Sequence, residues 1–308
     1  MLNTPMDVLD QFPVRKTKQQ KQAFREAVQA YCQSLGYEAT VETGSMGVRN
    51  LVIGDPKTAA YLVTAHYDTP ARMWLPNMVT PQNLTVYLFY QILVLGILVL
   101  GAILPGVLVG VLAGNAELGS LVAVAVYWIL FLLMMVGPAN PTNANDNTSG
   151  VVTVLEMART MPENQRHRVA FVLFDLEEAG LLGSSAYRKA HKAETDRQII
   201  LNLDCVGDGS EIILYPTKKL CKDEGKLRRL CSIVSRNGSK TVAVCCKGFR
   251  FYPSDQANFP YGVGIGAFHR KKGMGPYYSR IHTAKDTVLD ETNVNILRAA
   301  LTSLITGA

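Results

Sequence analysis

Five short segments of the sequence place histidine or acidic side chains at the end of an apolar run or inside a polar turn. The segments are LVTAHYDT, NANDNTSG, VAFVLFDLEEAGLLGS, IILNLDCVGDG and YYSRIHTAKDT, and they carry His66, Asp146, Glu177, Glu178, Asp204 and His282. A single residue of this kind is more often structural, but the repetition of one pattern is informative. Because the carboxyl ends of strands in an α/β sheet converge on one crevice, we expect these side chains to meet. Two imidazoles and several carboxylates suit a pair of Zn²⁺ ions.

Alternating strands and helices are expected to position these side chains. Hydrophobic periodicity and turn residues predict strands at 37–42, 48–53, 60–65, 168–174, 199–203, 211–214 and 241–245, and helices at 15–35, 150–159, 177–191, 227–235 and 292–305. The glycine-, proline- and tyrosine-rich stretch after residue 245 is expected to form loops. The pattern predicts an α/β fold with a largely buried sheet.

One block of the chain lacks the composition of a globular domain. Between Leu84 and Val136 the only charged residue is Glu117. The runs 84–104 and 120–136 are long enough to cross a bilayer as helices, whereas a buried pair of core helices rarely lacks a polar face over this length. The metal-ligand candidates lie on both sides of the block, so the chain must return to its starting side. We therefore predict a transmembrane hairpin at 84–136, inserted into one discontinuous domain made of 1–83 and 137–308.

The charges that flank this block predict its orientation. The connection between the two runs holds Glu117 but no Lys or Arg, while Lys57, Arg72 and Arg159 flank the hairpin. The excess of positive charge on cytoplasmic segments then places the catalytic domain in the cytoplasm, in a protein with two spans in the cell membrane. A glycine at every fourth position, 106, 110 and 114, allows close helix contact either within the hairpin or in a homodimer.

Composition narrows the partners of the remaining chain. The formal net charge is +6, yet basic and aromatic residues are not interleaved and no nucleic-acid-binding module is present, so no nucleic acid partner is expected. The six cysteines contain no C-x-x-C pair, and a chain of 308 residues has no need of disulfide staples. Both observations favour a reducing compartment for the globular part.

The motifs, in this order and approximate spacing, resemble the family-28 metallopeptidases, the two-zinc aminopeptidases of the bacterial leucyl aminopeptidase and aminopeptidase Y type. The resemblance covers the chain from about 61 to 287, except the hairpin. It implies an α/β zinc-exopeptidase fold, with a mixed, mostly parallel central sheet and helices on both faces, and two Zn²⁺ per chain. It implies that His66 and Asp204 bind one zinc and that Glu178 and His282 bind the other. Asp146 would bridge both ions.

The resemblance also implies two catalytic roles and exposes two departures. Glu177 would be the general base, and Asp68 would hold the His66 ring in its orientation. Gln256 stands where relatives commonly have histidine, and Asn147 where many have a second aspartate. Tyr277 or Tyr278 is a candidate for stabilising the oxyanion, although aromatic loop residues more often serve packing.

These expectations combine into a membrane-anchored di-zinc exopeptidase, an aminopeptidase acting at the cytoplasmic face. Its substrates would be peptides, and the position of the hairpin near the site suggests hydrophobic or acylated ones drawn from the lipid bilayer. One alternative is a glutaminyl cyclase-like acyltransferase on a related fold with one working zinc. Another is a non-catalytic scaffold, which the complete set of ligand candidates argues against.

Overall fold

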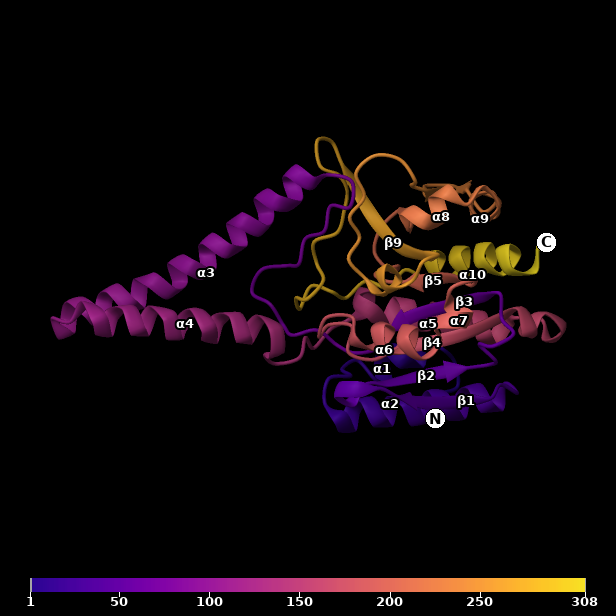
Figure 1. Ribbon diagram of the computed structural model, residues 1–308, viewed down its shortest axis with the longest axis horizontal. Coiled ribbons are helices and arrows are strands. Elements are labelled where there is room, and N and C mark those ends of the chain that lie inside the picture. Colours follow the sequence, from indigo (N-terminus) through magenta and orange to yellow (C-terminus); the bar gives the residue numbers. More distant parts are fainter. Residues whose placement is uncertain (1, 308) are drawn as a thin grey trace.

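The structure is a computed structural model that describes residues 2–307. Figure 1 shows two parts: a body built around a β-sheet, and a hairpin of two long helices that projects from one side of the body. The hairpin is α3 (Leu84–Ala113) and α4 (Ala116–Val136). The first helix begins at Leu84 and the second ends at Val136, and the division of the chain into domains stays a prediction.

Ten strands form one sheet in the order β1-β2-β4-β3-β5-β9-β6-β8-β7, with β10 paired to β9. The strands are β1 (Ala39–Thr43), β2 (Arg49–Ile53), β3 (Tyr61–His66), β4 (Val169–Phe174), β5 (Ile199–Leu203), β6 (Glu211–Pro216), β7 (Ser235–Asn237), β8 (Lys240–Val244), β9 (Gly262–Lys271) and β10 (Gly275–Tyr277). The central strands β4, β3, β5 and β9 are parallel, and so are β6 and β8, whereas the remaining pairs are antiparallel. The sheet is mixed, as predicted, but mostly parallel only at its centre.

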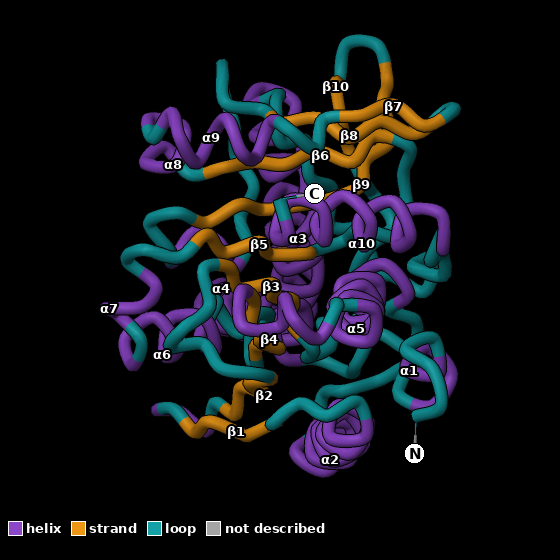
Figure 2. Tube along the Cα trace, turned by 90° about the vertical axis from the view of Figure 1, so that its right-hand side faces the viewer, coloured by secondary structure: helices purple, strands orange, loops and turns teal. Residues whose placement is uncertain are grey.

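Helices cover both faces of the sheet, as the sequence predicts (Figure 2). The body helices are α1 (Asp7–Gln11), α2 (Lys18–Ser34), α5 (Gly150–Thr160), α6 (Leu182–Ala190), α7 (Lys192–Thr195), α8 (Lys218–Lys222), α9 (Glu224–Cys231) and α10 (Glu291–Thr306). Successive residues of β4 alternate between two cores: Phe171 packs in the cluster that contains α2, α5 and α10, and Phe174 packs with Tyr187 of α6. All six residues of β4 are buried, as expected of a strand covered on both faces.

Two predicted helices and one predicted loop are wrong in their bounds or type. The helix expected at 177–191 begins only at Leu182, because residues 177–181 form a turn. The helix expected at 227–235 is α9, which ends at Cys231 and is followed by the short strand β7. The largest miss is β9, a central strand in a stretch expected to form loops.

Glycine explains why β9 was not recognised. Its segment GVGIGAFHRK has three glycines, which weaken a strand in isolation. In the fold these glycines make room for neighbours: a Cβ on Gly264 would lie 2.5 Å from the Tyr252 ring, and one on Gly262 would lie 2.1 Å from the Gln256 carbonyl oxygen. Close packing against β9 therefore requires residues that look like loop residues in the sequence.

The hairpin is longer than predicted at both of its inner ends. The first helix continues through Pro105 to Ala113, and the second begins at Ala116. The helices touch at their glycines, since a Cβ on Gly106 would lie 2.6 Å from the Gly119 carbonyl oxygen. Gly106 and Gly110 thus pack against Gly119 within the hairpin, whereas Gly114 has no neighbour within 4 Å of a built Cβ. A homodimer stays a prediction.

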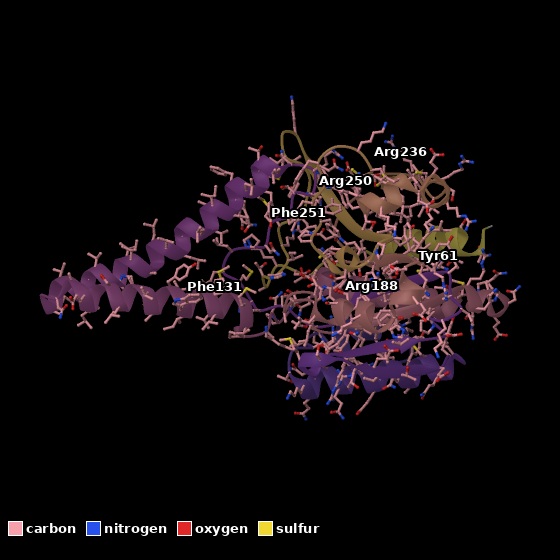
Figure 3. The ribbon with its side chains drawn as sticks, in the orientation of Figure 1. Tyr61, Phe131, Arg188, Arg236, Arg250 and Phe251 are labelled. Carbon is pink, nitrogen blue, oxygen red and sulfur yellow. The ribbon has the colours of Figure 1, made fainter. Side chains whose placement is uncertain are left out.

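The surface of the hairpin is mostly apolar, apart from the tip, where Asn115 and Glu117 are exposed. Both helices are long and apolar enough to cross a membrane, and only 22% and 6% of their most apolar 18-residue windows are buried. All but five of the exposed large apolar side chains in residues 2–307 belong to the hairpin. In Figure 3 these side chains stand out from α3 and α4 with no other element of the chain against their outer surfaces. Length and composition alone are weak evidence for a membrane span, but no element within residues 2–307 covers the outer surface of the hairpin.

Candidate metal centre

The carboxyl ends of the central strands bring the predicted ligands together. β3 ends in His66, the chain after β4 leads to Glu177 and Glu178, and the residue after β5 is Asp204. Because these strands are parallel and adjacent, their carboxyl ends lie at one edge of the sheet. Two loops complete the group: one carries Asp146, which has a non-helical backbone shortly before α5, and the other carries His282.

Two groups of three side chains share Asp146. His66, Asp146 and Asp204 form one group, and Asp146, Glu178 and His282 form the other, with ligand atoms within 4.8 Å of one another in each. His66 Nε2 lies 3.2 Å from Asp146 Oδ1, and His282 Nε2 lies 3.1 Å from Asp146 Oδ2. Each oxygen of one carboxylate therefore faces a different imidazole, which is the geometry of a carboxylate that bridges two ions.

The spacing and chemistry of these atoms fit zinc. Zinc bonds to nitrogen and oxygen are about 2.0–2.1 Å long, so two ligand atoms of a tetrahedral ion lie roughly 3.3 Å apart. The remaining contacts are 3.8 Å between His66 Nε2 and Asp204 Oδ1 and 3.5 Å between His282 Nε2 and Glu178 Oε2. Within residues 2–307, Asp204 Oδ1 and Glu178 Oε1 are buried without a hydrogen-bond partner. Buried polar atoms normally have partners, and a metal ion at each group would supply them.

Asp68 links a ligand histidine to the turn that carries the glutamates. Its Oδ1 lies 3.5 Å from His66 Nδ1, which is longer than a regular hydrogen bond. The same carboxylate accepts the backbone N–H groups of Glu177 at 3.0 Å and Glu178 at 3.2 Å. Asp68 therefore holds the glutamate turn firmly and lies next to the His66 ring.

Three residues of the site have left-handed backbone. Leu176, which precedes the glutamate pair, has φ of 55°, Cys205 after Asp204 has 53°, and His282 itself has 61°. Residues other than glycine rarely adopt this region, at a cost on the order of 1–3 kcal/mol each, and they cluster at functional sites. The turn at Leu176 lets both glutamates lie within 4.8 Å of His66, so the pair sits in a turn and not on a helix.

Negative charge dominates the centre. Burial raises the pKa of Glu177 and of Glu178 well above the usual value, and neighbouring carboxylates raise it further. Burial opposes a charged imidazole at His66, yet Glu177, Asp146 and other carboxylates raise the pKa of His66 well above its usual value. His66 and Asp146 are buried, whereas Glu177, Glu178 and His282 are half-buried. The centre is short of positive charge and opens to solvent on the side of the glutamates and His282.

Polar residues that the sequence reasoning missed shape the loop of Asp146. Asp286 accepts the backbone N–H of Asn145 at 2.7 Å and that of Asp146 at 3.0 Å. The Asn147 amide donates to the Leu203 carbonyl at 2.9 Å, and its oxygen accepts from Gly150. Asn147, noted above as a departure, therefore fastens the loop. A polar residue four positions after His282 was a visible but unspecific signal for Asp286.

Two cations lie behind the centre. Arg15 is fully buried and donates to the carbonyl oxygens of Tyr67 and Phe12; burial lowers the pKa of Arg15 to about 10, and nearby Asp68 and Asp146 oppose that shift. Lys21 of α2 forms a buried ion pair with Asp175 at 2.7 Å. These contacts fix the N-terminal segment against the strand ends, and nothing in the spacing of either residue reveals them.

Gln256 and Tyr278, which the sequence analysis also singled out, are packed in the interior. Gln256 is buried, donates to the Tyr252 carbonyl at 2.7 Å and accepts from Asn202 at 3.2 Å. Tyr278 is buried and stacks on Phe268 with ring centroids 5.3 Å apart. Burial raises the pKa of Tyr278 well above its usual value, so this phenol stays protonated. The contacts give Tyr278 a packing role, and the oxyanion role stays a prediction for either tyrosine.

Known structures share this fold at low sequence identity. Glutaminyl cyclase from Porphyromonas gingivalis superposes with a TM-score of 0.62 and 16% identity, over 99% of this chain and 97% of its own. A Zn-dependent exopeptidase from Parabacteroides distasonis gives 0.61 and 13%, over 99% and 96%. The LapA aminopeptidase of Legionella pneumophila gives 0.61 and 12%, over 98% and 67%. At these identities the likeness shows the α/β zinc-exopeptidase fold alone.

Sequence comparison identifies the family. The chain is 40% identical to the aminopeptidase YwaD of Bacillus subtilis over 77 residues, which span 24% of this chain and 17% of that relative. The model of peptidase family M28 matches residues 132–304, a range that contains Asp146, Glu177, Glu178, Asp204 and His282. His66 and Asp68 lie outside this range, on the other side of the hairpin, and the fold returns them to the same edge of the sheet. The match covers more than half of the chain, which therefore belongs to peptidase family M28.

Proposed function

We propose that this protein is a di-zinc aminopeptidase. The observation that carries the proposal is Asp146, whose two oxygens face His66 and His282 at 3.2 and 3.1 Å and so provide for two ions. His66 and Asp204 would complete one zinc site, and Glu178 and His282 the other. Some of the similar proteins are aminopeptidases, which supports cleavage at the N-terminal end of the peptide substrate.

The residues of the site divide the chemistry of amide hydrolysis between them. Zinc bound there supplies Lewis acidity, which lowers the pKa of water and polarises the scissile carbonyl. Glu177 lies beside the ligands but is not needed for either group, so its carboxylate is free to take the proton of the attacking water and return it to the leaving amine. Asp68 positions the Glu177 turn through its two backbone hydrogen bonds, and it would orient the nearby His66 ring once the ring binds zinc.

Substitution of Glu177 tests this assignment. We expect Glu177→Gln to reduce kcat by a factor on the order of 10²–10⁴, because the amide cannot accept the proton. Zinc content, measured by elemental analysis, should remain at two ions per chain. In the neighbouring variant Glu178→Gln, zinc content itself should fall, and the surface variant Glu163→Gln serves as the control. Normal turnover by Glu177→Gln would exclude Glu177 as the base.

A cyclase is the second candidate because glutaminyl cyclase shares the fold over nearly its full length. Zinc stoichiometry and products separate the two functions. An aminopeptidase with this ligand set should bind two zinc ions and release free amino acids from peptides. One tightly bound zinc per chain, with ammonia released from peptides that begin with glutamine, would favour the cyclase.

We also propose that α3 and α4 span a membrane and anchor the catalytic domain, formed by 1–83 and 137–308. The uncovered apolar surface of both helices supports this, because contiguous apolar surface of this extent is unfavourable in water. Two spans leave both halves of the metal centre on one side. The scarcity of positive charge between the helices favours the cytoplasmic side. To test this, a thiol reagent is added outside intact cells. We expect it to label Ser120→Cys at the tip of the hairpin and to leave Ser303→Cys on the body unlabelled.

A further inference from the structure

The two hairpin helices separate as they approach the body. They touch where Gly106 meets Gly119, and Gly101 still lies near Leu130, a Cβ there being 3.4 Å from the leucine Cδ1. From that point the helices diverge toward the body, as Figure 1 shows. The space left between them is an apolar cavity of about 350 Å³ with walls that include Leu98 and Met134.

A second cavity adjoins the first. Its volume is about 640 Å³, and it shares Met73, Trp74 and Met134 with the first cavity. Its far wall is Thr283 to Lys285, the three residues that follow the ligand candidate His282. We call the two cavities together the hairpin chamber.

Backbone hydrogen bonds tie the chamber to the metal centre. The N–H of Met73 donates to the His282 carbonyl at 2.7 Å, and the N–H of Arg72 donates to the Pro138 carbonyl at 2.8 Å. The segment that walls the chamber is thereby fixed both to a ligand residue and to the end of α4. An occupant of the chamber would extend from the residues that follow His282 to the gap between the helices.

Charge is confined to one end of the chamber. Arg72 and Lys285 line the cavity beside the metal centre, are exposed, and form no ion pair within residues 2–307. The cavity between the helices has no charged residue in its lining. A peptide fits this arrangement, since its backbone carbonyls can accept hydrogen bonds from the two cations while its apolar side chains fill the end between the helices. An acyl chain offers no acceptor beyond its head group.

We propose that the hairpin chamber binds the apolar residues that follow the scissile bond, so that the enzyme selects peptides with hydrophobic sequences delivered from the bilayer. This inference rests on the proposed aminopeptidase function and on the proposed membrane span. The chamber opens between two helices whose outer surfaces face the hydrocarbon in that arrangement. A hydrophobic peptide can then reach the metal centre without crossing water.

The test compares three substrates with the same first residue, in one detergent and with the full-length zinc-loaded protein. They are a decapeptide with leucine and valine after the first residue, a decapeptide with serine and glycine there, and the aminoacyl amide of that residue. The variant Met134→Trp fills the chamber from the wall that both cavities share. Its matched control is Met135→Trp, the next residue on α4, which lines neither cavity and is 49% exposed.

We expect the wild type to prefer the apolar over the polar decapeptide by a factor of about ten or more in kcat/KM, the range that a few buried methylenes give. Met134→Trp should abolish that preference by raising the KM for the apolar decapeptide, and Met135→Trp should preserve the preference. Equal preference in both variants, or no preference in the wild type, would overturn the chamber while leaving amide hydrolysis intact. Failure to cleave all three substrates, across a set of first residues, would instead overturn the proposed function.

Discussion

The metal centre gathers five carboxylates at one edge of the sheet, whereas the hairpin leaves apolar side chains exposed along both of its helices. Each arrangement is unfavourable as it stands. Charges are costly to bury without counter-charges, and large apolar surfaces are costly to hydrate.

The comparison favours a partner outside the chain for each region. In the proposed function, cations would bind the carboxylates of the centre, and hydrocarbon would surround the apolar surface of the hairpin. Each of the following changes removes one partner or alters one region. If only the region that was left unchanged responds, the comparison is contradicted.

Metal removal should have the largest effect. Chelation should abolish activity completely, because neither the water nor the scissile carbonyl would be activated. It should also lower the free energy of unfolding of the body, since a ligand present at 1,000 times its Kd stabilises by about 4 kcal/mol. Thermal unfolding with and without chelator measures this, and added zinc should restore both quantities. Unchanged thermal stability would mean that the buried carboxylates are balanced without metal.

Removal of the buried cation of α2 should come next. Asp175 would remain buried without its partner in Lys21→Met. The variant should therefore lose about 3–5 kcal/mol of the free energy of unfolding. Chemical denaturation monitored by circular dichroism is the measurement. Lys18→Met, on an exposed position of the same helix, is the matched control. The control should change stability by no more than about 0.5 kcal/mol, as is usual for surface substitutions.

A charge on the hairpin separates a membrane span from an exposed soluble helix. Leu100 is 59% exposed. If lipid surrounds it, Leu100→Lys should cost about 2.5–3.5 kcal/mol of membrane insertion free energy, which an insertion assay with microsomes measures. In water the same change would be neutral within about 0.5 kcal/mol. We expect that neutral result for the control Met46→Lys on the body, where Met46 is 77% exposed. Unimpaired insertion of the Leu100 variant would argue against the span.

Crowding of the helix contact should have the smallest effect. The side chain introduced by Gly106→Leu would meet the Gly119 backbone. Overpacking of this kind should destabilise the hairpin by about 1–3 kcal/mol. Gly96→Leu is the matched control, since a Cβ there has no atom within 4 Å. Unfolding in mixed detergent micelles, followed by helicity, compares the two. The metal content of the body should be unaffected in both variants.

The ligand candidates were predictable because each depends on a local pattern. His66 and Asp204 lie at the ends of apolar runs, and the carboxyl ends of parallel strands lie at one edge of the sheet. The apolar helices at 84–136 were equally visible, since length and lack of charge suffice to predict them. In both cases the signal lies within a short stretch of sequence.

The supporting residues were not predictable for the opposite reason. Arg15 and Asp286 act through partners that are distant in the sequence, and their own neighbourhoods resemble ordinary surface sequence. β9 was missed because its glycines serve close packing against Tyr252 and Gln256, a tertiary requirement that contradicts strand propensity. The helix at Glu177 was placed too early, because the left-handed turn at Leu176 leaves no mark in the hydrophobic pattern.

The pairing of β3 has a consequence for synthesis of the protein. Tyr61 pairs with Val169 on one side and Ile199 on the other, and both partners follow the hairpin in the chain. At about 5–20 residues per second, the ribosome completes the hairpin well before either partner strand emerges. In the proposed arrangement, insertion into the bilayer therefore precedes closure of the sheet. The nascent metal centre would be assembled only after the chain is already tethered, so no active enzyme would be released into the surrounding solution on the way.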